Sequence, residues 1–246
     1  MDIKRLQKNW DEFGKIDPLW AILTDPNKKG GKWKIDEFFQ TGVKEIDAVM
    51  KYIDSLGVSI QRRRALDFGC GVGRLTQPLC QYFNEVYGSS ETAAARHRNR
   101  CPIQHGDKCH YYLNETDDLK LFPNNYFDFI YTNITLQHMK PNISKNYIKE
   151  FLRILCPNGL LIFQLPSQLR VINLSTLILR ICPKTLLDLT YRKVKYRNQP
   201  RMEMYRIKRK HVVRLLKLNG AKIVDIIEYQ SAGTWWVSYR YCVTKE

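Results

Sequence analysis

Three glycines at alternate positions, Gly69, Gly71 and Gly73, follow a short apolar segment that contains Asp67. Glycine weakens strands and helices alike, because its backbone has the most freedom to lose on folding. The cluster therefore indicates a backbone that bends sharply or that a ligand approaches closely. In an open parallel sheet, ligands bind beyond the carboxyl ends of the strands, and a glycine turn that leaves the first strand lies at that edge.

The segments around this turn alternate between strand-like and helix-like patterns. Short apolar segments predict strands at residues 64–69, 85–89, 109–115, 127–134 and 160–165. Helices are expected at residues 36–56, 74–83, 91–100, 144–155 and 211–220. The last two apolar segments, 222–229 and 234–243, are joined by so short a turn that they must pair antiparallel. The alternation predicts a Rossmann-like α/β fold: a seven-stranded, mostly parallel sheet with helices on both faces and an antiparallel C-terminal strand pair.

The helix expected at 36–56 shows the clearest helical period. Its apolar stripe recurs at steps of three and four residues and consists of Phe39, Val43, Ile46, Met50 and Ile53. Gly57 supplies a stop signal directly after it.

The composition narrows the function classes. No segment approaches the roughly 20 apolar residues that a membrane span requires, and the seven cysteines lack the C-x-x-C spacing of metal sites. The N-terminus lacks the apolar core of a signal peptide, so we expect a cytoplasmic protein without a bound metal. The net charge of +16 is compatible with an anionic partner such as RNA, although basic residues concentrate only at 191–210.

The glycine turn does not fit the dinucleotide pattern G-x-G-x-x-G, because Arg74 stands at the place of the third glycine. The segment "LDFGCGVGRL" instead resembles motif I, D/E-x-G-x-G-x-G, of the class I S-adenosylmethionine-dependent methyltransferases. Two more segments resemble that family: "LKLFPNNYFDFIYTNITLQHM" its fourth-strand region, and "FLRILCPNGLLIFQLPS" its R-x-L-x-P-G-G block with the fifth strand. The resemblance covers residues 63–165 and implies this fold, methyl transfer, and S-adenosylmethionine as cofactor.

The resemblance also implies roles for the residues of the glycine turn. Asp67, Gly69, Gly71 and Gly73 would form the loop that holds the methionine part of the cofactor, with Asp67 fixing its ammonium group. Arg74, at the start of the next helix, would pair with the cofactor's carboxylate. The alternatives are a purely structural turn and an exposed surface arginine.

The largest departure from the family's pattern follows the second strand. The family has an acidic residue there that accepts hydrogen bonds from both ribose hydroxyls, but here the position falls on Ser90, with Glu91 one place later. Either Glu91 reaches round, or the site binds the cofactor weakly, or this segment is altered in this chain. After the third strand, the resemblance implies that Asp118 bonds the adenine amine and that Leu119 offers its backbone N–H to the ring.

Polar residues after the fourth strand lie where cofactor and acceptor are expected to meet. These residues are Asn133, Thr135, Gln137 and His138. Asn133 is assigned to the cofactor, and His138 is a candidate general base, with a merely packed histidine as the alternative. In-line transfer from an activated sulfonium gains much from alignment in a dry pocket, and a base is needed only for a hydroxyl, thiol or protonated amine.

We expect a single domain over residues 1–246. Its parts are an N-terminal lid or helical extension (1–57), a cofactor-binding core (63–165), an insert on the substrate side (166–205), and a C-terminal helix with its strand pair (206–246). Trp33 and Phe39 are candidates for closing the site. The insert joins an apolar stripe to basic residues, which fits a lipid-like or aromatic acceptor with an anionic part, or a membrane surface.

Three functions follow from these patterns. The first is an S-adenosylmethionine-dependent methyltransferase with a small-molecule or lipid-like acceptor. The second is an RNA methyltransferase, motivated by the basic segment 191–210. The third is a non-catalytic protein that keeps the fold but has an impaired cofactor site, motivated by Ser90.

Overall fold

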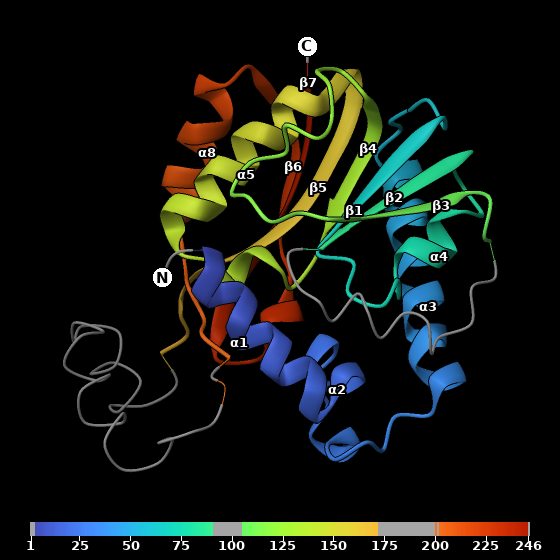
Figure 1. The fold of residues 1–246 in the computed structure, drawn as a ribbon. Coiled ribbons are helices and arrows are strands. Elements are labelled where there is room, and N and C mark those ends of the chain that lie inside the picture. Colours follow the sequence, from blue (N-terminus) through green and yellow to red (C-terminus); the bar gives the residue numbers. More distant parts are fainter. Residues whose placement is uncertain (1–2, 91–104, 172–199, 201, 246) are drawn as a thin grey trace.

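The computed structural model describes residues 3–90, 105–171, 200 and 202–245 (Figure 1). The helix expected at 91–100 and most of the substrate-side insert lie outside the described residues.

A seven-stranded sheet forms the centre of the molecule, in the order β3-β2-β1-β4-β5-β7-β6. The strands are β1 (Arg64–Phe68), β2 (Glu85–Ser90), β3 (Cys109–Leu113), β4 (Phe127–Thr132), β5 (Leu155–Leu169), β6 (Ala221–Glu228) and β7 (Trp236–Lys245). The first five strands run parallel, and β7 pairs antiparallel with both β5 and β6. The predicted seven-stranded, mostly parallel sheet with an antiparallel C-terminal pair is therefore confirmed.

Helices cover both faces of the sheet (Figure 1). The α-helices among the described residues are α1 (Ile3–Ile16), α2 (Pro18–Ile22), α3 (Ile35–Ser55), α4 (Thr76–Leu79), α5 (Pro141–Ile154) and α8 (Arg209–Leu218). The helices α5 and α8 lie on one face, and α3 and α4 on the other. Among the described residues, no helix combines the length and the apolar composition that crossing a bilayer requires.

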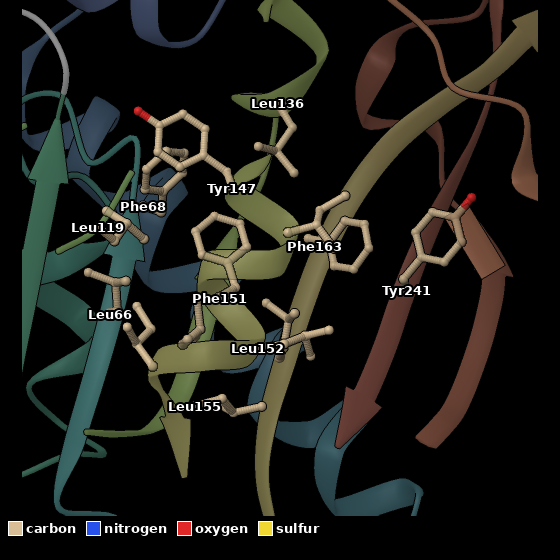
Figure 2. Packing of buried hydrophobic residues seen from close by; sticks show 14 of the residues in the cluster. Leu66, Phe68, Leu119, Leu136, Tyr147, Phe151, Leu152, Leu155, Phe163 and Tyr241 are labelled. Atoms are coloured by element: carbon tan, nitrogen blue, oxygen red, sulfur yellow. The ribbon is translucent and has the colours of Figure 1, made fainter. Parts of the chain in front are cut away.

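Two hydrophobic clusters hold these layers together, one on each face of the sheet. Neighbouring residues of β1 serve different clusters, with Leu66 in one and Ala65 in the other, because side chains alternate across a strand. Figure 2 shows the cluster beneath α5, where Phe68 packs against Tyr147 with ring centroids 4.6 Å apart. This packing fixes the carboxyl end of β1, from which the glycine turn leaves.

The helix predicted at 74–83 is much shorter in the structure, where α4 spans only Thr76–Leu79. After Leu79 the amides of Cys80, Gln81 and Tyr82 bond the carbonyls three residues back, so the segment continues as tight turns instead of α-helix. The predicted helix at 144–155 also differs, because α5 ends at Ile154 and Leu155 already has extended dihedrals that begin β5.

Candidate functional site

A cavity of about 490 Å³ opens at the carboxyl ends of β1 and β4, the two neighbouring strands at which the order of the sheet reverses. In open α/β sheets this is the place where ligands bind. The walls come from α1 and α2, from α3, from the glycine turn, from the segment that follows β4, and from residues near both ends of the turn between β6 and β7.

The glycine turn forms the floor of this cavity. Gly69, Gly71 and Gly73 have φ values of +83°, +53° and +92°, which L-residues with a side chain rarely adopt. A Cβ atom at Gly69 would lie 2.3 Å from Oγ1 of Thr135, so the turn also packs tightly on the segment after β4. Gly69 and Gly71 line the cavity, whereas Gly73 faces the hydroxyl of Tyr111.

Asp67 lies at the end of β1 and lines the cavity, but only 1% of it is exposed. Its Oδ2 accepts a hydrogen bond of 2.7 Å from the hydroxyl of Thr76. Burial raises the pKa of this carboxyl to about 7, although the bond from Thr76 and the charge of Arg74 act in the opposite direction. Asp67 is therefore partly protonated at neutral pH.

Arg74 is buried and ion-paired rather than exposed. Its Nη2 donates to Oε2 of Glu45 over 2.8 Å, and its Nη1 donates to the hydroxyl of Thr41 over 3.3 Å. Glu45, on α3, also lines the cavity, and its Oε1 accepts bonds from Tyr131 (2.9 Å) and Asn133 (2.8 Å). Sequence reasoning missed Glu45, because no local motif distinguishes it from the other charged residues of α3.

The residues assigned to ribose and adenine lie in different surroundings. Ser90, at the end of β2, is buried and lines the cavity, and Glu91 lies outside the described residues. Asp118 and Leu119 are not part of the cavity wall. Asp118 pairs with Lys120 over 2.8 Å, and the backbone N–H of Leu119 donates to Glu150 over 2.9 Å. These contacts engage the groups that the adenine role would need, and that role stays a prediction.

His138 and Gln137 lie in the short 3₁₀ helix Leu136–His138 after β4, and both line the cavity. Nδ1 of His138 is 2.8 Å from the main-chain oxygen of Glu203. A carbonyl oxygen only accepts, so Nδ1 carries the proton and Nε2 accepts the amide N–H of Gln137 over 3.2 Å. Burial lowers the pKa of His138 to about 4, which leaves the ring neutral at pH 7.

A further group of residues that line the cavity is apolar or aromatic. It includes Trp10, Met139, Met202, Met204 and Trp236. The ring of Trp10 meets His138 edge-on, with centroids 5.0 Å apart. The N-terminal segment thus contributes to the wall.

The two aromatic residues proposed for the lid lie elsewhere. Trp33 donates its indole N–H to the carbonyl of Leu23 and packs on Phe38, and neither Trp33 nor Phe39 lines the cavity. The N-terminal residues that do line it include Leu6, Trp10 and Ile22. The division of the chain into lid, core and insert stays a prediction.

Buried polar atoms without partners gather at this cavity. Of the eight side-chain atoms of this kind in the described part of the chain, four belong to cavity residues: Nε of Arg74, Oδ1 of Asn133, Oε1 of Gln137 and Oγ of Ser231. A buried polar group without a hydrogen bond costs roughly 1–3 kcal/mol. The clustering of donors and acceptors fits a polar ligand that would supply the missing bonds.

Comparisons with known proteins agree with this geometry. Residues 66–163 match the family model of a methyltransferase domain. A search of curated proteins by sequence gives no match.

Solved structures with the same fold span most or all of the chain. Magnesium protoporphyrin IX methyltransferase from Synechocystis PCC 6803, with bound S-adenosylhomocysteine, has a TM-score of 0.63 at 18% identity, covering 100% of both chains. A Leishmania major S-adenosylmethionine-dependent methyltransferase has a TM-score of 0.62 at 15% identity, covering 98% of this chain and 83% of that one. Haemonchus contortus phosphoethanolamine N-methyltransferase 2, in complex with phosphomonomethylethanolamine and S-adenosylhomocysteine, has a TM-score of 0.56 at 12% identity, covering 81% and 52%. At these identities the likeness shows the fold.

Proposed function

We propose that this S-adenosylmethionine-dependent methyltransferase, whose residues 66–163 match the family model of a methyltransferase domain, methylates a small-molecule or lipid-like acceptor held in the apolar part of the cavity. The observation that carries the proposal is the composition of one cavity wall. Ionisable side chains, Glu45, Asp67 and Arg74, stand beside the glycine turn, whereas two indole and three thioether side chains are among the residues that line the rest of the cavity.

The charged part of the wall suits the amino-acid end of the cofactor. Arg74 retains an unpartnered Nε–H donor, and Asn133 retains an unpartnered Oδ1 acceptor. When bound, S-adenosylmethionine supplies an electrophilic methyl group on a sulfonium. The residues of this chain would bind and orient it, while the glycines let the backbone approach without a side chain in between.

The apolar part of the wall suits an acceptor that is itself largely apolar. Trp10, Trp236 and the three methionines bring no charge to the cavity, and methionine adapts to irregular shapes. An acceptor packed against these side chains would displace water from them, and a dry pocket favours displacement at a charged sulfonium by an aligned nucleophile. Two of the related structures support a small acceptor, since their names give magnesium protoporphyrin IX and phosphoethanolamine.

His138 fits an orienting role better than that of a strong base. Its two ring nitrogens are engaged with Glu203 and Gln137, and its pKa of about 4 gives little driving force for removing a proton at pH 7. We therefore assign His138 to holding the Gln137 amide with its Oε1 free of other bonds, next to the acceptor.

The alternative RNA acceptor has no support among the described residues. Half of its motivating segment, residues 191–199 and 201, lies outside them, and among the described residues that line the cavity Arg74 is the one lysine or arginine.

Transfer of a tritiated methyl group tests the proposal. The protein is incubated with labelled S-adenosylmethionine and, in parallel, with the organic-soluble, aqueous small-molecule and RNA fractions of a cell lysate. Label in a small molecule, most of it extractable into organic solvent, is the expected result. Label confined to RNA contradicts the proposed acceptor. Absence of S-adenosylhomocysteine binding in calorimetry at millimolar ligand contradicts the function as a whole.

A further inference from the structure

Glu45 is the centre of a hydrogen-bond network at the cavity wall. Its two carboxylate oxygens accept bonds of 2.8–2.9 Å from three side chains, Arg74, Tyr131 and Asn133, which come from the glycine turn and from the end of β4. The Glu45 side chain is still 15% exposed, whereas that of Arg74 is 3% exposed. The carboxylate is thus held firmly, in a side chain that is partly exposed and lines the cavity.

This network presents both signs of charge side by side. The amino-acid end of S-adenosylmethionine carries an ammonium and a carboxylate on one carbon atom, so an adjacent anion and cation complement it. Both polar atoms of the network without partners, Nε of Arg74 and Oδ1 of Asn133, are also a donor and an acceptor. A buried ion pair costs desolvation energy, which makes a purely stabilising role for it a weak explanation.

We propose that Glu45 binds the ammonium group of the cofactor's amino-acid end, with Arg74 as the partner of the adjacent carboxylate. The proposal rests on the proposed function and assigns the ammonium to α3 rather than to Asp67. The contacts of Asp67 favour this change. Only 1% of Asp67 is exposed, its Oδ2 is engaged by Thr76, and its raised pKa makes it a weaker anion at neutral pH. Asp67 instead stabilises the glycine turn through the hydrogen bond that it accepts from Thr76.

Two ligands that differ only in the amino-acid end separate this role from a structural one. Methylthioadenosine has the adenosine and the sulfur of S-adenosylhomocysteine but no ammonium or carboxylate. Calorimetry on the full chain measures both affinities. In Glu45→Gln, the affinity for S-adenosylhomocysteine should fall about 10- to 100-fold, the range expected for a lost charge-assisted hydrogen bond. The affinity for methylthioadenosine should change less than about threefold, because this ligand has no ammonium group for Glu45 to bind.

Tyr131→Phe is the matched control, since it removes a bond to the same carboxylate without changing the charge. Its affinity for S-adenosylhomocysteine should stay within about fivefold of wild type. An equal loss of affinity for S-adenosylhomocysteine and for methylthioadenosine in Glu45→Gln assigns a structural role to Glu45 and overturns the proposal. A selective loss in Asp67→Asn but not in Glu45→Gln restores Asp67 as the ammonium partner and overturns it too.

A second measurement needs no variant. Decarboxylated S-adenosylhomocysteine keeps the amine and lacks the carboxylate, and it should bind the wild-type protein more tightly than methylthioadenosine does. Equal affinities of these two ligands overturn the ammonium site, whether or not Glu45→Gln folds. Failure of the wild type to bind any of the three ligands overturns the proposed function itself.

Discussion

Gly42 on α3 lies so close to the glycine turn that a Cβ atom at this position would be 2.0 Å from the carbonyl oxygen of Arg74. Glu45 stands three residues further along, on the same face of the helix. The close approach of the two backbones therefore brings the Glu45 carboxylate to the Arg74 guanidinium. Gly42 permits the close approach of α3 to the glycine turn, and the ion pair between Glu45 and Arg74 then joins the two elements.

We expect Gly42→Ala to lower the free energy of unfolding by about 1–3 kcal/mol, because α3 must move away from the turn. Helix propensity alone predicts the opposite sign, since alanine is favoured over glycine by roughly 0.5–1 kcal/mol in a helix interior. The same movement should weaken S-adenosylhomocysteine binding. Urea unfolding and calorimetry measure the two effects, and Gln40→Ala, at an exposed position of α3, is the control. A stabilised Gly42→Ala variant contradicts the close packing of Gly42 on the carbonyl of Arg74.

Gly73 and Tyr111 provide a second steric prediction. A Cβ atom at Gly73 would lie 2.3 Å from the Tyr111 hydroxyl, and the φ of +92° adds backbone strain. We expect Gly73→Ala to destabilise by about 2–4 kcal/mol, and Tyr111→Phe to recover about 1 kcal/mol or more of this in the double variant. Gly220→Ala, with φ of +74° and open space around it, measures the backbone strain alone. Strict additivity of the two changes in urea unfolding contradicts the contact.

The raised pKa of Asp67 predicts a pH dependence of stability. The folded pKa is about 7 and the ordinary value is 3.8, so between these values the native state keeps a proton that the unfolded state has lost. The contribution of Asp67 to the free energy of unfolding should therefore fall as pH rises, by up to about 1.4 kcal/mol per pH unit. It should level off above the folded pKa.

The difference between wild type and Asp67→Asn isolates this effect, because the other titrating groups cancel. Unfolding by urea is measured from about pH 5 to pH 8, with Asp54→Asn, an exposed position on α3, as a second reference. A difference that stays constant over this range shows that the carboxyl is ionised in the folded protein at all these values.

The sequence predicts the parts of the site that local motifs encode. Asp67, Gly69 and Gly71 all border the cavity. They can be predicted because the pattern that marks them, an apolar strand followed by spaced glycines, lies within a few residues of sequence. Glu45 belongs to the same wall, but only the packing of α3 brings it there. That packing joins residues that are far apart in the sequence, and no local pattern indicates it.

The stripe of α3 shows why a long-range contact is missed. The apolar period predicts Phe39 and Val43 on the buried face, whereas the structure buries Phe38 and Gly42 there. Glycine has no apolar side chain, so a buried glycine such as Gly42 does not contribute to the apolar period of the helix. The stripe is then assigned to the neighbouring positions.

His138 yields the last prediction. Its Nδ1–H donates to the Glu203 carbonyl, its Nε2 accepts from Gln137, and burial lowers its pKa from 6.5 to about 4. We expect its imidazole to stay neutral, with the proton on Nδ1, over about pH 5 to 8. The native state would then lose stability as pH falls from 6.5 toward 4, because the unfolded state binds the proton first. Long-range ¹H–¹⁵N NMR of the ring nitrogens measures the tautomer and midpoint, and signals absent from His138→Gln give the assignment. A midpoint near 6.5, or a proton on Nε2, contradicts the bond to Glu203 and restores His138 as a candidate base.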